Sequence, residues 1–246
     1  MMNELLLLTQ IFTVLPIKRK LNYSNGALKR ASLLMSLHGA ALYLPAVGLS
    51  MVLTFLKCPS NINALVTLLF HLLLTGAYHL DGLSDSADGL LSGRERERML
   101  DIMKDSRIGV YGAAALFFDL ALKIMIYNDL ILTRRIWLLP LLGAVGKLSL
   151  CYVAFLGTPA KPDSSGNIFV RNMGIPALAV NTGVAAILGI ALGEGMVVII
   201  SIAALLLFSL LFTGWAKKQI GGIVGDNLGF SSEIGEMLLG ILAVWA

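Results

Sequence analysis

The sequence predicts an all-α fold, a polytopic transmembrane helical bundle with six to seven spans. Of the 246 residues, 57% are hydrophobic and only 14% are charged, and the mean hydropathy is +0.82. A soluble globule of this size needs more polar surface than this composition supplies. The apolar residues also gather into runs that approach the roughly 20 residues a helix needs to cross a bilayer. We therefore expect a single integral membrane domain over residues 1–246.

The spans follow from these apolar runs, taken in chain order. Glu4 to Leu15 is too short to cross and is followed by the basic residues Lys18, Arg19 and Lys20, which are typical of the headgroup region. The segment from Glu233 to Ala246 has only a short apolar run, which fits either a seventh span or a helix lying in the interface. The six predicted spans are 31–56, 61–80, 108–127, 136–156, 174–193 and 195–214.

The basic residues predict the orientation, because cytoplasmic loops of membrane proteins are enriched in Lys and Arg. With the N-terminus inside and six crossings, 14 Lys and Arg residues fall in inside loops and 3 fall outside. This bias places the polar motif segments 79–112 and 215–232 on the cytoplasmic face of the cell membrane. It also accounts for the net charge of +4 without a nucleic-acid partner.

The first motif segment reads HLDGLSDSADGLLSGRERERMLDIMKDSRIGVYG and is rich in aspartate. If 79–91 is helical, the i, i+4, i+7 spacing puts Asp81, Asp85 and Asp88 on one face. Like charges at this spacing repel one another, so a cation is expected among them. Magnesium is held by a few carboxylates together with the phosphates of its substrate. The spacing therefore predicts a site for Mg²⁺ and a diphosphate.

The alternative is an ordinary solvated helix face. The alternating signs of RERERMLD are typical of an exposed, salt-bridged helix, which is how we interpret Glu95, Glu97 and Asp101. The first three aspartates instead have small neighbours, which leave room for a ligand. These neighbours are Gly82, Ser84, Ser86, Ala87 and Gly89.

The end of this segment supplies a fourth carboxylate, Asp105. It would join the cluster as a metal ligand or general base if 93–106 folds back as a helical hairpin, and otherwise it is a helix-end charge. Lys104 is a further catalytic candidate, since a cation there would offset the charge of a leaving phosphate. The candidate substrate-binding residues of the region are Arg94, Ser106 and Arg107.

The second motif segment, KKQIGGIVGDNLGFSSEIGE, combines glycines with Asp226. Backbone without side chains can approach a ligand closely, which makes Gly221, Gly222, Gly225 and Asp226 candidate substrate-binding residues. Glycine also serves tight turns and close helix packing in membranes, so this signal alone is weak.

Charges inside the predicted spans need partners, because each costs roughly 2.5–3.5 kcal/mol at the centre of a span on insertion scales. Asp119 and Lys123 form an i, i+4 pair that can neutralise itself. Lys147 has no partner in its own span, so we expect a substrate phosphate or a carboxylate from another helix beside it. His79 is interpreted as a packing residue, with orientation of Asp81 as the alternative.

These motifs give the sequence a resemblance to a known family. HLDGLSDSADGL, from His79 to Leu90, and IMKDSRIGVYG, from Ile102 to Gly112, resemble the signature of the cobalamin synthases, the adenosylcobinamide-GDP ribazoletransferases. GGIVGDNLG, from Gly221 to Gly229, resembles their GGxTGDxLG loop, with Val224 in place of Thr. A middle span carries Gly146 and Lys147 where the family tends to have Ser-Arg.

The resemblance implies a Mg²⁺-dependent transferase. It would join adenosylcobinamide-GDP and α-ribazole, or the 5′-phosphate of α-ribazole, and release GMP. Asp81, Asp85, Asp88 and Asp105 would be metal ligands, and with Lys104 they would form the catalytic set. A homo-oligomer and a complex with other cobamide-assembly enzymes both remain open.

Three other functions compete with this interpretation. Intramembrane prenyltransferases usually have two separated Asp-rich motifs, whereas the second segment here offers only Asp226 before Glu233. The aspartate motif of CDP-alcohol phosphotransferases has Ala-Arg at the positions where this chain has Asp85-Ser86. A cation transporter would carry acids along the midplane and show repeat symmetry, neither of which is apparent.

Overall fold

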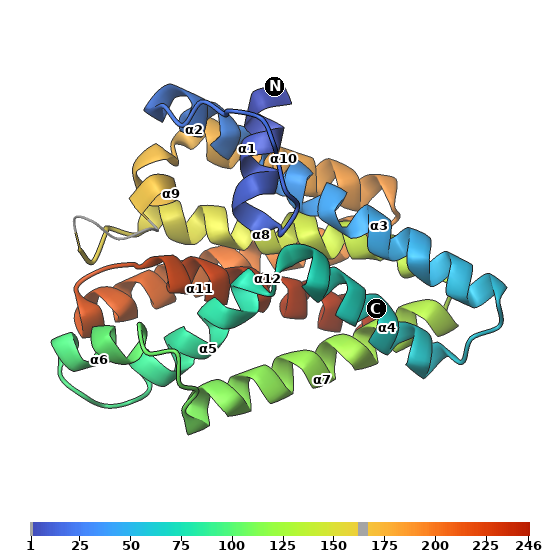
Figure 1. The fold of residues 1–246 in the computed structure, drawn as a ribbon. Helices are drawn as coiled ribbons and strands as arrows, with labels where there is room; N and C mark the ends of the chain where they lie inside the picture. The colour runs from blue at the N-terminus through green and yellow to red at the C-terminus, as the bar shows by residue number, and fades with distance from the viewer. Residues whose placement is uncertain (1, 162–166) are drawn as a thin grey trace.

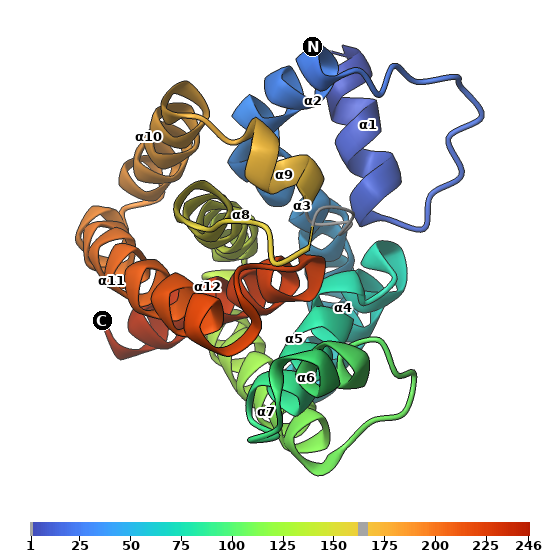
Figure 2. The same ribbon diagram turned by 90° about the vertical axis from the view of Figure 1, so that its left-hand side faces the viewer.

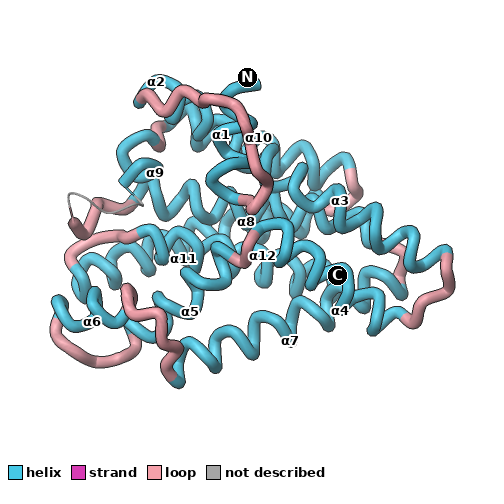
Figure 3. The backbone as a smooth tube through the Cα atoms, viewed as in Figure 1, coloured by secondary structure: helices cyan, strands magenta, loops and turns pink. Residues whose placement is uncertain are grey.

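The computed structural model describes residues 2–161 and 167–246, and all regular elements among them are helices. Figure 1 shows them as an elongated bundle, which confirms the predicted all-α class. Figure 3 shows that the connections between them are mostly short loops. The helices are α1 (Met2–Phe12), α2 (Asn25–Ala31), η1 (Ser32–Leu34), α3 (Met35–Phe55), α4 (Ser60–Thr75), α5 (Tyr78–Leu90), α6 (Arg96–Ile102), α7 (Val110–Leu132), η2 (Ile136–Leu138), α8 (Leu139–Leu156), α9 (Asn167–Asn172), α10 (Ile175–Ala191), α11 (Gly195–Ile220) and α12 (Gly225–Trp245).

Helix α8 is the core of the bundle. Its residues from Leu139 to Ala154 are all buried. Figure 2 shows α3, α10, α11 and α12 arranged around it, and each of them packs against it. A helix that is apolar on every side is stable only where other helices surround it.

Among the described residues, five helical segments are long and apolar enough to cross a membrane, or six if a bent helix pair counts as one span. The upper count agrees with the lower end of the predicted six to seven. Helix α10 is shorter than the predicted span 174–193 because it ends at Ala191. The final segment, which the sequence left open, belongs to α12, and α12 has the length and composition of a span.

The predicted span 61–80 is not one continuous helix, because the chain bends within it. Helix α4 ends at Gly76, whose φ of +67° is left-handed, and Ala77 follows with a φ of +53°. Two consecutive left-handed residues end one helix and start another. Helices α4 and α5 therefore meet at 88°, and α5 carries the aspartates as a separate helix.

Candidate active site

The site is built where α5 packs closely on the start of α12. A Cβ on Gly82 would lie 2.7 Å from the carbonyl oxygen of Asp226, and one on Gly229 would lie 3.2 Å from the backbone of His79. Glycine at both positions is what permits this approach. Asn227 joins the two helices, since its Nδ2 donates to Ser86 Oγ at 3.0 Å. The small residues noted in the sequence thus serve helix packing.

This packing brings carboxylates of both motifs together. Asp81 and Asp226 line one cavity of 460 Å³. Asp85 is half-buried and within electrostatic range of Asp81, Asp226 and Asp88. These carboxylates belong to two segments that are distant in sequence. Residue spacing within the first motif could not reveal that Asp226 lies beside it. Gly225, another predicted residue, lines the same cavity.

The carboxylate of Asp88 binds backbone amides at the start of α7. It is 9% exposed, and its oxygens accept hydrogen bonds from the amides of Gly109 at 2.7 Å and Gly112 at 2.9 Å. A carboxylate at this place satisfies two amides that the first turn of a helix leaves without partners. Asp88 therefore joins the end of α5 to the start of α7.

Asp105 has cationic neighbours. Its carboxylate pairs with the guanidinium of Arg107, with 2.6 Å between Oδ2 and Nη2. The hydrogen bonds from Arg107 lower the pKa of the Asp105 carboxyl to about 2, so it is ionised at all physiological pH values. Lys104, Ser106 and Arg107 are exposed on the loop that carries it.

The remaining glycines of the second motif build a turn. Gly221 ends α11 with a φ of +83°, and a Cβ on Gly222 would meet Pro159 and Ala160. A hydrogen bond holds this turn in place: the carbonyl of Ile223 accepts it from the amide of Ala160 at 3.0 Å. Packing of this turn is sufficient to explain these two glycines, and their contact with substrate stays a prediction.

Arg94 and Arg96 lie on the exposed connection around the start of α6. Arg94, the predicted binding residue, makes a long hydrogen bond from its amide to Ser92 Oγ, at 3.4 Å. Arg96 was not singled out from the sequence, yet its Nη2 donates to the carbonyl of Ala160 at 3.0 Å. It thereby links the first motif to the turn beside the second.

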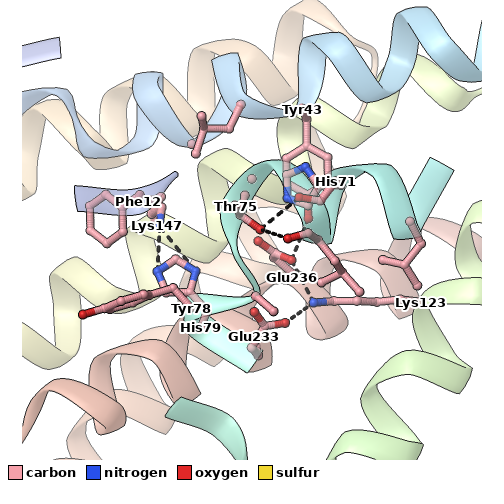
Figure 4. A pocket seen from close by; sticks show the side chains of 16 residues that line it. Phe12, Tyr43, His71, Thr75, Tyr78, His79, Lys123, Lys147, Glu233 and Glu236 are labelled. Carbon is pink, nitrogen blue, oxygen red and sulfur yellow. Dashed lines mark hydrogen bonds and ion pairs between the residues drawn. The ribbon is translucent and has the colours of Figure 1, made fainter. Parts of the chain in front are cut away.

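Lys147 lies behind the cavity, beside His79. Its Nζ is 2.8 Å from His79 Nε2 and 3.7 Å from the centre of the Phe12 ring. Figure 4 shows the lysine between the histidine and the phenylalanine. The partner expected for this lysine was a phosphate or a carboxylate, whereas the structure pairs it with an imidazole and an aromatic ring.

A second buried ionic cluster centres on Lys123. Its Nζ is 3.4 Å from Asp119 and 3.0 Å from Glu236, and it also pairs with Glu233. Tyr43 donates to Glu236 at 2.7 Å. Figure 4 shows the lysine among these side chains. The sequence analysis missed Glu233 and Glu236, although two acids three residues apart in an apolar segment are themselves a signal.

Comparisons with known proteins agree with this arrangement of motifs. The sequence model described as cobalamin-5-phosphate synthase matches residues 4–244. The chain belongs to the cobalamin-5-phosphate synthase family. An adenosylcobinamide-GDP ribazoletransferase of Clostridium botulinum strain Loch Maree is 36% identical over 241 residues, covering 96% of this chain and 95% of the relative. One of Clostridium kluyveri is 32% identical over 244 residues, covering 97% of this chain and 94% of the relative. No solved structure matches.

The cobalamin-5-phosphate synthase motifs can be tested for their fit to a divalent cation. In the described part of the chain, no three His, Cys, Asp or Glu side chains are placed to hold a metal by themselves. Magnesium is usually bound by one or two carboxylates and completes its shell with water and substrate phosphate. Asp81 and Asp226 provide two hard oxygen donors in the wall of the cavity, and Asp85 lies within electrostatic range of both. The donor set therefore fits Mg²⁺ bound together with a substrate.

Proposed function

We propose that the chain joins adenosylcobinamide-GDP to α-ribazole, or to the 5′-phosphate of α-ribazole. The products are adenosylcobalamin, or its 5′-phosphate, and GMP. Family membership supports the reaction class. The structural observation that carries the proposal is the meeting of the two family motifs: Asp81 of α5 and Asp226 of α12 line one cavity, and Asp85 lies within electrostatic range of both.

The proposed reaction is a phosphoryl transfer assisted by these carboxylates. The ribose hydroxyl oxygen attacks the phosphorus on the cobinamide side of the diphosphate. The bond from that phosphorus to the bridging oxygen breaks, and GMP leaves with the electron pair. A carboxylate of the cluster takes the hydroxyl proton. Reactions of this type depend chiefly on positioning and charge neutralisation. The tight α5–α12 contact supports the positioning.

Asp81, Asp85 and Asp226 are the residues we propose to hold Mg²⁺. Mg²⁺ held by them would supply positive charge against the diphosphate. Asp88 positions the start of α7 through two backbone amides. Asp105 orients Arg107, which with Lys104 would contact the departing phosphate.

The aspartates are proposed to face the cytoplasm from the cell membrane. Helices α2, α6 and α9 lie at one end of the bundle and the α3–α4 connection lies at the other (Figure 1). The first end carries most of the basic residues, including Arg94, Arg98 and Arg171, whereas Lys57 and Arg134 belong to the second. This asymmetry supports a cytoplasmic first end.

The experiment that tests the function is GMP release by purified, detergent-solubilised protein. The protein receives adenosylcobinamide-GDP and α-ribazole, with Mg²⁺ or with EDTA. We expect GMP and a cobalamin product in equal amounts, with both lost in EDTA and restored by added Mg²⁺. Folded protein that binds Mg²⁺ but yields no product would contradict the proposal and favour another diphosphate-alcohol transferase.

A further inference from the structure

The 460 Å³ cavity beside the carboxylates has walls of aromatic rings. Phe12 and Phe169 form its floor, where they are 5% and 9% exposed and stack with centroids 5.5 Å apart. Tyr23 and Tyr78 stand at the mouth, where they are 48% and 64% exposed. Rings that are half open to solvent beside buried rings form a surface on which a planar ligand can stack.

The charges of the lining residues indicate which part of a ligand this cavity can hold. Asp81 and Asp226 are in its wall, and none of the described residues that line it is a lysine or arginine. A phosphate among the aromatic rings would lack a side-chain counter-ion, whereas a phosphate beside Asp81 and Asp226 would share the Mg²⁺ proposed there. The part of the ligand that enters is therefore uncharged, and phosphates remain outside the aromatic walls.

The volume and the polarity of the cavity limit further which part of a substrate it can hold. A volume of 460 Å³ is in the range of small-molecule sites, about 300–1,000 Å³. It accommodates a nucleoside but not a corrin ring with its side chains. Guanine would require several hydrogen-bond partners along its edge, and the carboxylates of Asp81 and Asp226 are the groups we assign to Mg²⁺ and the ribose. Gln10, a polar side chain in the wall, already accepts from Tyr23 Oη at 3.0 Å.

On these grounds, and resting on the proposed function, we propose that the cavity binds the planar base of the acceptor nucleoside. The base stacks on Tyr78 and the Phe12–Phe169 pair. Its ribose points to Asp81 and Asp226, so that the attacking hydroxyl reaches the carboxylates. The guanine nucleotide then occupies a different part of the site.

Substitution of the exposed ring provides the test, because it costs little folding energy. Tyr78→Leu removes the ring and Tyr78→Phe retains it. Stacking of a base on an aromatic side chain contributes about 1–3 kcal/mol. We expect Tyr78→Leu to raise the KM for α-ribazole about 10-fold, with the KM for adenosylcobinamide-GDP within twofold of the wild-type value. Tyr78→Phe should restore the wild-type KM. Phe117→Leu, which removes a ring 66% exposed on α7, is the matched control.

Equilibrium dialysis with labelled α-ribazole separates this proposal from the proposed function, because it requires no turnover. Binding that Tyr78→Leu weakens about 10-fold supports the base site even in a protein that releases no GMP. Unchanged α-ribazole KM and Kd in an enzyme that turns over would overturn the base site and leave the function intact. A rise in the KM for adenosylcobinamide-GDP alone would overturn it too, since the nucleotide would then occupy the cavity.

Discussion

Asp81, Asp85 and Asp88 share one helix, yet their carboxylates have different surroundings. Asp81 is exposed in the cavity wall, Asp85 is half-buried among other acids, and Asp88 is buried against the backbone of α7. Helical spacing fixes their common direction, but the helices that pack on α5 determine which oxygens remain available to a ligand.

At the residue scale, replacement of Asp85 tests the cluster directly. Asp85→Asn keeps the side-chain volume and removes the charge among Asp81, Asp88 and Asp226. We expect turnover to fall at least 10²-fold, the size of a general-base or charge contribution. The measurement is GMP release by protein with an unchanged unfolding temperature. Asp101→Asn, on the exposed face of α6, should retain activity, and an active Asp85→Asn would remove this residue from the site.

A second residue-scale prediction concerns Lys123. Lys123→Met would leave Glu233, Glu236 and Asp119 buried without their shared counter-ion. Loss of one partner from a buried ionic group costs about 3–5 kcal/mol. We expect a marked drop in the thermal unfolding temperature in detergent, whereas Lys18→Met, at an exposed position, should have none. Equal unfolding temperatures would show that the cluster is not structural.

At the element scale, the bend between α4 and α5 determines the site. The 88° angle turns α5 out of the line of α4 and places it along the start of α12. The two helices approach closely at Gly82 and Gly229. The site therefore depends on helix-to-helix distance as much as on the carboxylates.

Gly82→Ala measures that dependence. The new methyl group would overlap the carbonyl oxygen of Asp226 and push α12 from α5. Misplacement by about 1 Å can cost roughly 10²-fold in rate, so we expect a loss of this size in kcat. Gly48→Ala is the matched control, because nothing lies within 4 Å of a Cβ there. Full activity of Gly82→Ala would show that the helices tolerate separation.

Asp88 provides the other element-scale test. Asp88→Ala leaves the amides of Gly109 and Gly112 without acceptors, and loss of a helix cap costs about 0.5–2 kcal/mol. We expect a lower unfolding temperature than in Asp88→Asn, whose amide oxygen still accepts. Thermal unfolding of both variants without ligand gives the comparison. Loss of turnover at an unchanged unfolding temperature would instead favour the metal-ligand role.

At the scale of the whole molecule, the two ends of the bundle differ in charge. Helix α6 and the turn before α12 lie at one end, towards which α5 runs, and the α3–α4 connection lies at the other (Figure 1). Because a bilayer separates these ends, orientation determines where the polar substrates must be.

Single cysteines test this orientation in a background with Cys58 and Cys151 replaced by serine. Glu95→Cys lies just before α6 and Asn61→Cys lies near the start of α4. In intact cells, a membrane-impermeant maleimide should label Asn61→Cys only, and in inverted vesicles Glu95→Cys only. The reverse pattern would place the aspartates outside the cytoplasm.

The sequence by itself determined the all-α membrane class, the helix that carries three aspartates and the family. Composition and local spacing contain this information, because a bilayer demands long apolar helices and a helix fixes which residues share a face. The tertiary structure alone decided that Asp226 joins Asp81, that Asp88 caps α7 and that Lys123 pairs with Glu233 and Glu236. These contacts join segments far apart in the chain, and they depend on close helix packing that spacing within one segment does not encode.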